Sequence, residues 1–160
     1  MRQGTEWFPS PNFRRAKREI QFIVIHATAT SGISSPREWL CNPASKVSAH
    51  YLIGRDGKIL QLVEDSNISW HAGESSWAGK TNLNNSSIGI ELVNANDGKM
   101  NYPEEQFEAC LKITSDMAKE FKVKLSNIVR HLDIAPGRKT DPAGFPWDDF
   151  KMRLHDLGVA

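Results

Sequence analysis

Apolar and polar positions follow each other along the chain in patterns that predict alternating strands and helices. Residues 22–26, Phe-Ile-Val-Ile-His, form a continuous apolar run rich in β-branched side chains. Such a run is typical of a central strand buried on both faces. Residues 127–131 are predicted as a second short strand. Each of these two strands is expected to end on a histidine, His26 and His131.

Three further segments have the composition of strands. Residues 48–54 and 58–63 are joined by Arg55-Asp56-Gly57, and the Asp-Gly step marks a tight hairpin turn. Residues 87–93 alternate, so that Ile88, Ile90 and Leu92 are expected on one face and Gly89, Glu91 and Val93 on the other. The missing side chain of Gly89 is interpreted as room beside Glu91 for substrate or metal-bound water.

Helical periodicity is clearest over residues 103–121. Its apolar positions recur at three- and four-residue steps and are Phe107, Cys110, Leu111, Thr114, Met117, Ala118 and Phe121. Residues 35–40 are predicted as a short helix and residues 147–157 as a last helix before Gly158. Together these elements predict an α/β (α+β) fold, with a central mixed β-sheet flanked by helices.

Size and charge limit the function classes. A chain of 160 residues that is 39% hydrophobic fits one domain over residues 1–160, with residues 1–19 as an N-terminal arm. The formal charge of +1 argues against a dedicated nucleic-acid binder. The basic cluster of Arg14, Arg15, Lys17 and Arg18 is interpreted as part of a solvated arm, with a phosphate or membrane patch as the alternative.

No apolar run is long enough for a membrane span, and residues 1–12 lack the apolar core of a secretory signal. We therefore expect a protein that is cytoplasmic as synthesised, able to reach the cell wall after lysis or release, and monomeric. Cys41 and Cys110 lack the spacing of a disulfide framework or a zinc knuckle and are interpreted as free thiols.

Two histidines and an aspartate form the candidate metal site. His26 and His131 stand at predicted strand ends, and Asp141 follows in a loop that contains Pro136, Gly137 and Pro142. Two imidazoles and one carboxylate are a common ligand set for catalytic Zn²⁺, because they leave the fourth position open. The alternative is that each strand-end histidine binds a backbone carbonyl instead.

Five stretches of the chain, taken together, resemble a known family. They are residues 22–28, 47–53, 70–73 (Trp-His-Ala-Gly), 84–92 and 131–142, which contains His-Leu-Asp-Ile-Ala-Pro-Gly-Arg-Lys-Thr-Asp-Pro. In this order they resemble the successive motifs of the N-acetylmuramoyl-L-alanine amidases, which include bacterial recycling amidases, phage lysozymes of the amidase type and peptidoglycan recognition proteins. The resemblance covers roughly residues 20–150 and implies that fold.

The resemblance also implies residue roles. His26, His131 and Asp141 match the zinc ligands, Glu91 the general base and Lys139 the partner of the developing oxyanion. The non-catalytic alternatives are a structural acid for Glu91 and an exposed loop lysine for Lys139. Where the phage branch has a catalytic tyrosine, this chain has Ala49, so proton transfer is expected to depend on Glu91.

Trp70, His71, Asn84 and Arg138 are the candidate substrate-binding residues. A core indole, a hydrogen-bonded histidine, a loop-capping asparagine and a solvated arginine are the respective alternatives. His50 is interpreted as structural and His155 as a surface residue.

The implied activity is zinc-dependent hydrolysis of the bond between the lactyl group of N-acetylmuramic acid and L-alanine, in peptidoglycan or muropeptides. The protein would be a phage endolysin or a bacterial cell-wall amidase. The rival is a module of the same fold that binds muropeptide without hydrolysis.

Overall fold

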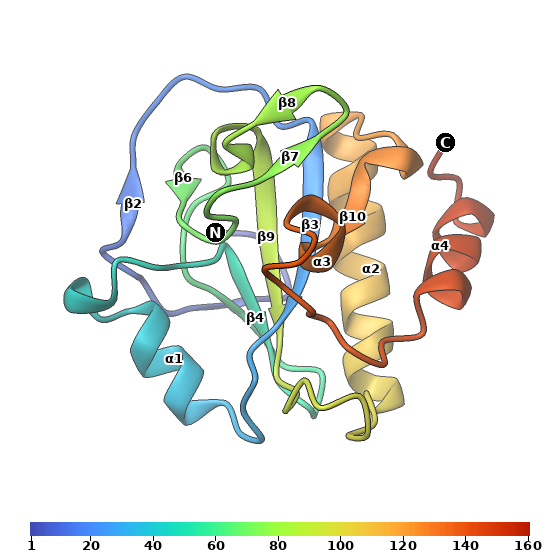
Figure 1. The fold of residues 1–160 in the computed structure, drawn as a ribbon, viewed down its shortest axis with the longest axis horizontal. Helices are drawn as coiled ribbons and strands as arrows, with labels where there is room; N and C mark the ends of the chain where they lie inside the picture. The colour runs from blue at the N-terminus through green and yellow to red at the C-terminus, as the bar shows by residue number, and fades with distance from the viewer.

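The computed structural model describes residues 1–160 and is built around a central sheet (Figure 1). The strands are β1 (Glu6–Trp7), β2 (Phe13–Arg14), β3 (Phe22–Ala27), β4 (Tyr51–Ile53), β5 (Ile59–Gln61), β6 (Ile68–Ser69), β7 (Ser76–Trp77), β8 (Lys80–Thr81), β9 (Ser87–Leu92) and β10 (Ile128–Arg130). The α-helices are α1 (Ser34–Leu40), α2 (Glu104–Phe121), α3 (His131–Ile134) and α4 (Trp147–Asp156).

The central sheet has six strands in the order β1-β5-β4-β9-β3-β10. Strands β4, β9, β3 and β10 run parallel to one another, whereas β5 is antiparallel to β4. The sheet is therefore mixed and the fold is α/β, as predicted. Because the four parallel strands all end at the same edge, residues at their carboxyl ends are brought together there.

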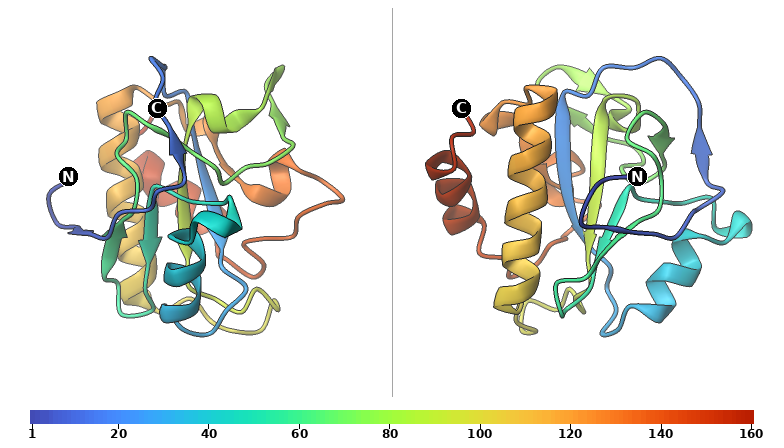
Figure 2. Two further views of the ribbon diagram at one scale, coloured as in Figure 1. Left: turned by 90° about the vertical axis from the view of Figure 1, so that its left-hand side faces the viewer. Right: turned by 180° about the vertical axis from the view of Figure 1, so that it is seen from behind.

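The two faces of the sheet have different cores. Ile23, Ile25, Ile88, Ile90 and Leu92 point to the face covered by α2 and α4, where they join a cluster of 19 buried residues. On the opposite face lie two smaller clusters, with α1, α3 and the β7–β8 ribbon around them (Figure 2, left). No helix of the structure combines the length and the apolar character needed to cross a membrane.

The long elements lie where the periodicity predicts them, but His131 does not belong to the strand that was predicted to contain it. Strand β10 stops at Arg130 and His131 opens the short helix α3, so the prediction of a strand through His131 was wrong. The turn arises because the Asp133 carboxylate accepts a hydrogen bond from the Arg130 backbone N–H at 2.9 Å and caps the new helix. The change in direction places His131 above the sheet.

The N-terminal arm is more ordered than the solvated segment that we expected. Strand β1 pairs with β5, and β2 pairs with β6. Arg14, Arg15 and Lys17 are exposed, but Arg18 is half-buried and donates hydrogen bonds to the backbone carbonyls of Asn84, Ser87 and Asp65. For Arg18 the prediction was wrong, because its guanidinium ties the arm to the segment that precedes β9.

Candidate metal centre

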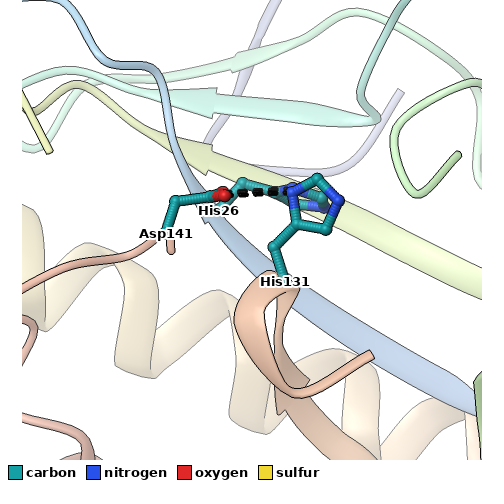
Figure 3. Close-up of side chains that lie close together, drawn as sticks. All are labelled: His26, His131 and Asp141. Carbon is teal, nitrogen blue, oxygen red and sulfur yellow. Dashed lines mark hydrogen bonds and ion pairs between the residues drawn. The ribbon is translucent and has the colours of Figure 1, made fainter. Parts of the chain in front are cut away.

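His26 and Glu91 are direct neighbours on adjacent parallel strands, β3 and β9. Both lie near the carboxyl ends of these strands and point to the face opposite α2. His131 extends from the first residue of α3 toward His26, and Asp141 reaches the same point from the loop that follows α3 (Figure 3). The three predicted ligands, His26, His131 and Asp141, are therefore brought together, and their side chains are buried.

The spacing of the three side chains fits a tetrahedral metal ion. The Nδ1 atoms of His26 and His131 are 2.9 Å apart. A carboxylate oxygen of Asp141 lies 3.6 Å from His26 Nδ1, and the other lies 3.1 Å from His131 Nδ1. Four ligands at the bond lengths of zinc are separated by about 3.3 Å from one another. These distances lie on both sides of that value, so small movements would satisfy a Zn²⁺ ion.

The protonation states also suit a metal. Burial, together with the neighbouring His131, lowers the pKa of His26 to about 4, so its imidazole is neutral at pH 7. Burial alone would raise the pKa of Asp141, but the close contacts of its carboxylate with His131 and His26 outweigh burial and hold that pKa well below its usual range. Neutral imidazole and ionised carboxylate are the forms in which these groups bind metals.

Glu91 borders the metal centre. Its carboxylate Oε1 lies 3.9 Å from His26 Nδ1, and its buried Oε2 has no hydrogen-bond partner. Burial, and then the charge of Asp141, raise the pKa of Glu91 to about 8, while Lys139 opposes the shift. A carboxylate with a raised pKa and a free oxygen is able to accept and return a proton near neutral pH.

The metal centre opens into a cavity of about 500 Å³. Its walls include the proposed ligands His131 and Asp141, the general-base candidate Glu91, part of α1 and residues of several loops. A volume of this size admits a small organic ligand such as a short peptide joined to a sugar.

The sequence matches a family model with the description N-acetylmuramoyl-L-alanine amidase, over residues 16–144. The chain belongs to this amidase family. The resemblance drawn from its five sequence stretches is thereby confirmed, and so is the fold that it implied.

Several relatives of known name are similar to this amidase-family chain. N-acetylmuramoyl-L-alanine amidase AmiD of Escherichia coli is 40% identical over 150 residues, which cover 84% of this chain and 53% of AmiD. 1,6-anhydro-N-acetylmuramyl-L-alanine amidase AmpD of Citrobacter freundii is 39% identical over 107 residues, 66% of this chain and 56% of AmpD. The chain thus spans about half the length of these curated relatives.

Solved structures of amidases superpose closely. A selenomethionine derivative of AmpD gives a TM-score of 0.82 at 29% identity and covers 96% of each chain. E. coli AmiD gives a TM-score of 0.79 at 34% identity, covering 91% of this chain and 60% of AmiD, and was solved with the substrate anhydro-N-acetylmuramic acid-L-Ala-D-γ-Glu-L-Lys.

Of the other predicted site residues, most line the amidase cavity. These are Trp70, His71, Arg138 and Lys139. The sequence analysis missed Trp39, which lies on α1, is 58% exposed and also lines this cavity. A signal was available, because Leu40 and Pro36 form the buried side of the short helix and adjacent residues cannot share a helix face. Because this exposed indole borders the cavity, it is available for contact with a ligand.

Asn84 occupies a different place from the one predicted. It does not line the cavity, and its side-chain oxygen accepts hydrogen bonds from the backbone N–H groups of His71 and Ala72 at 3.1 and 2.7 Å. Its place is that of the loop-capping alternative. The Arg138 guanidinium lines the cavity but also donates to the carbonyls of Ala72 and Glu74 at 2.9 and 2.7 Å, so part of it holds the loop.

The remaining polar residues also have defined places. His50 is fully buried and accepts a hydrogen bond from the Gly89 backbone N–H at its Nδ1, 3.1 Å away, as expected of a structural histidine. The side chain of His155 is 73% exposed. Cys41 and Cys110 are free thiols, as predicted.

Gly89 is next to Glu91 on the same face of β9, and we interpreted its missing side chain as room for substrate or water. That interpretation was wrong, because the imidazole of His71 fills the space. A Cβ atom at residue 89 would lie 2.4 Å from the His71 ring.

Replacing Gly89 by Ala is therefore expected to displace His71 and to lower the free energy of unfolding by about 1–3 kcal/mol, the usual effect of overpacking. Urea denaturation of the folded protein measures it. Gly32→Ala is the matched control, since a Cβ there meets no atom within 4 Å. Equal urea midpoints for the two variants would show that the His71 ring moves aside without a loss of stability.

Proposed function

We propose that this chain is a zinc-dependent amidase that cleaves the bond between the lactyl group of N-acetylmuramic acid and L-alanine in peptidoglycan or its fragments. The observation that carries the proposal is the buried set of His26, His131 and Asp141, of which His131 and Asp141 line a cavity together with Glu91. A phage endolysin and a bacterial cell-wall enzyme would both have this chemistry.

The relatives support this choice of substrate. Those matched are named as amidases of N-acetylmuramoyl-L-alanine or of its 1,6-anhydro form, and E. coli AmiD was solved with an anhydro-muropeptide. The polar walls of the cavity suit such a substrate, which combines a sugar with a peptide that carries carboxylates. Arg138 and Lys139 supply the positive charge on one wall.

In this proposal His26, His131 and Asp141 hold the metal. A bound Zn²⁺ supplies Lewis acidity at the scissile carbonyl and lowers the pKa of water. The backbone N–H of Ala27 donates to Asp141 Oδ2 at 3.2 Å and helps to fix the carboxylate. The structural elements that carry the three side chains are a strand, a helix start and a loop anchored by Asn96.

The carboxylate of Glu91, which lines the cavity, accepts the proton of the attacking water. It then returns this proton to the nitrogen of L-alanine as the carbon–nitrogen bond breaks. The ammonium of Lys139, which lines the same cavity, stabilises the negative charge that develops on the carbonyl oxygen. Neither step requires a nucleophilic serine or cysteine, so no covalent intermediate with the protein forms.

The test is mass spectrometry of the products from a soluble disaccharide-peptide and from insoluble sacculi, at equal bond concentration. We expect a peptide that begins with L-alanine and a peptide-free sugar from both substrates, because the cavity is large enough for the residues next to the bond.

Two results would contradict the proposal. Cleavage within the peptide or between sugars would give the chain another bond specificity. Retention of intact muropeptide without release of peptide would make the chain a binding module.

A further inference from the structure

A chain of buried hydrogen bonds runs from His26 away from the cavity. His26 Nε2 lies 2.8 Å from His71 Nδ1, and His71 Nε2 lies 2.9 Å from the Ser87 hydroxyl. The hydroxyl in turn lies 2.6 Å from the backbone carbonyl of Leu83. Ser87 and Leu83 are fully buried and His71 is 9% exposed, so water does not compete for these bonds.

The Leu83 carbonyl, at the end of this series of hydrogen bonds, determines the direction of every bond in the series. A carbonyl oxygen only accepts, so the Ser87 hydroxyl donates its one proton to Leu83. Ser87 is then an acceptor for His71, whose Nε2 must carry the proton. The neutral His71 ring is left with an acceptor at Nδ1, which receives the Nε2–H of His26. The lone pair of His26 is therefore on Nδ1, the atom that faces Asp141.

The imidazole of His131 is oriented in the same way by Ala72, the residue that follows His71 in the sequence. His131 Nε2 lies 3.2 Å from the carbonyl oxygen of Ala72, so this nitrogen carries the proton and Nδ1 carries the lone pair. The two Nδ1 lone pairs converge at 2.9 Å. Two such lone pairs repel each other unless they share an electrophile, as they do around a metal ion.

We propose that the dipeptide His71-Ala72 orients both imidazole ligands of the metal, and that Ser87 and His71 are positioning residues for zinc binding. The inference rests on the proposed function, because it takes the zinc site as its starting point. It gives His71 and Ala72 of the Trp-His-Ala-Gly stretch a role in orienting the ligands, whereas Trp70 of the same stretch lines the cavity.

The surroundings of this dipeptide hold it rigidly. The Asn84 side-chain oxygen accepts from the backbone N–H groups of both its residues. The backbone of Gly89 lies against the His71 ring, so closely that a Cβ there would lie 2.4 Å from it. Partners of metal-binding histidines that fix the tautomer commonly change metal affinity by about 10- to 100-fold when they are removed.

The first test is the zinc affinity of the full chain, measured by competition with a chromophoric chelator. Ser87→Ala removes the hydroxyl that fixes the direction, and we expect zinc to bind about tenfold more weakly. The matched control is Ser86→Ala, because Ser86 is the half-buried sequence neighbour that takes no part in this series of hydrogen bonds. Circular dichroism of each metal-free variant verifies that the fold is retained.

A second pair of variants separates positioning from packing. His71→Asn places an amide oxygen where Nδ1 was and keeps an acceptor for His26, whereas His71→Leu has none. We expect zinc affinity to fall by roughly 100-fold in His71→Leu and by less in His71→Asn. In nitrogen-15 spectra of the zinc-loaded wild type, His26 should show a protonated Nε2 and a metal-shifted Nδ1.

The outcomes separate the two proposals. A wild-type chain that binds no zinc would overturn the proposed function. A wild-type chain that binds zinc, with Ser87→Ala equal to Ser86→Ala or with Nε2 of His26 on the metal, would overturn the positioning role alone. Equal affinities of His71→Asn and His71→Leu would also contradict it.

Discussion

Replacing His26, His131 or Asp141 by alanine is expected to abolish zinc binding and to lower turnover by on the order of a thousandfold or more. The wild-type chain should retain about one zinc after dialysis, because three protein ligands leave one catalytic position open. A variant with two ligands loses most of that affinity. The metal contributes several kcal/mol to transition-state stabilisation, and each 1.36 kcal/mol is a factor of about ten in rate.

Atomic absorption after dialysis and release of L-alanine-containing peptide measure the two effects. His155→Ala is the matched control, because this histidine is on the surface of α4. Asp141→Cys is informative as well, since a thiolate also binds zinc and should preserve the metal. Full zinc content in the three alanine variants, or full activity after chelation, would contradict the ligand assignment.

Replacing Glu91 by Gln is expected to lower turnover by about 10²- to 10⁴-fold while leaving zinc bound, because the amide keeps the shape but cannot accept the proton. Lys139→Ala should cost about 10²- to 10³-fold through the loss of charge at the oxyanion. Single-turnover kinetics on a defined muropeptide, together with zinc content, measure both effects.

Lys112→Ala is the control for the loss of a lysine, because Lys112 lies on the outer face of α2 with its side chain 80% exposed. Near-normal turnover in Glu91→Gln would assign proton transfer to another group. Near-normal turnover in Lys139→Ala would leave it as the exposed loop lysine of the alternative interpretation.

Periodicity predicts the elements with long, regular patterns and misses the very short ones. Helix α2 and strands β3 and β9 bury whole faces, so their apolar positions determine them. Strands β1, β2, β6, β7 and β8 have two residues each. Two residues show no period, and such strands form only because tertiary neighbours supply the hydrogen bonds.

The residues proposed to bind the metal and to transfer the proton could be predicted from the sequence. His26 and His131 follow from predicted strand ends and Asp141 from its loop, and the family resemblance implies the roles of these residues and of Glu91. The groups behind them were not predictable, because their partners are remote in sequence: Asn84 binds the backbone 12 and 13 residues earlier. The contact of Gly89 with His71 likewise exists only after β9 is placed.

The parallel pairing of β3 with β10 also orders the events of folding. His26 and His131 are 105 residues apart in sequence, and they meet only when β10 has docked beside β3. Contacts of such long range form slowly, because the loop entropy is lost before the contact is gained. A partly folded chain without β10 therefore has no complete metal site. If the site binds zinc as proposed, the ion would therefore not template the sheet but would stabilise the finished fold against unfolding by mass action.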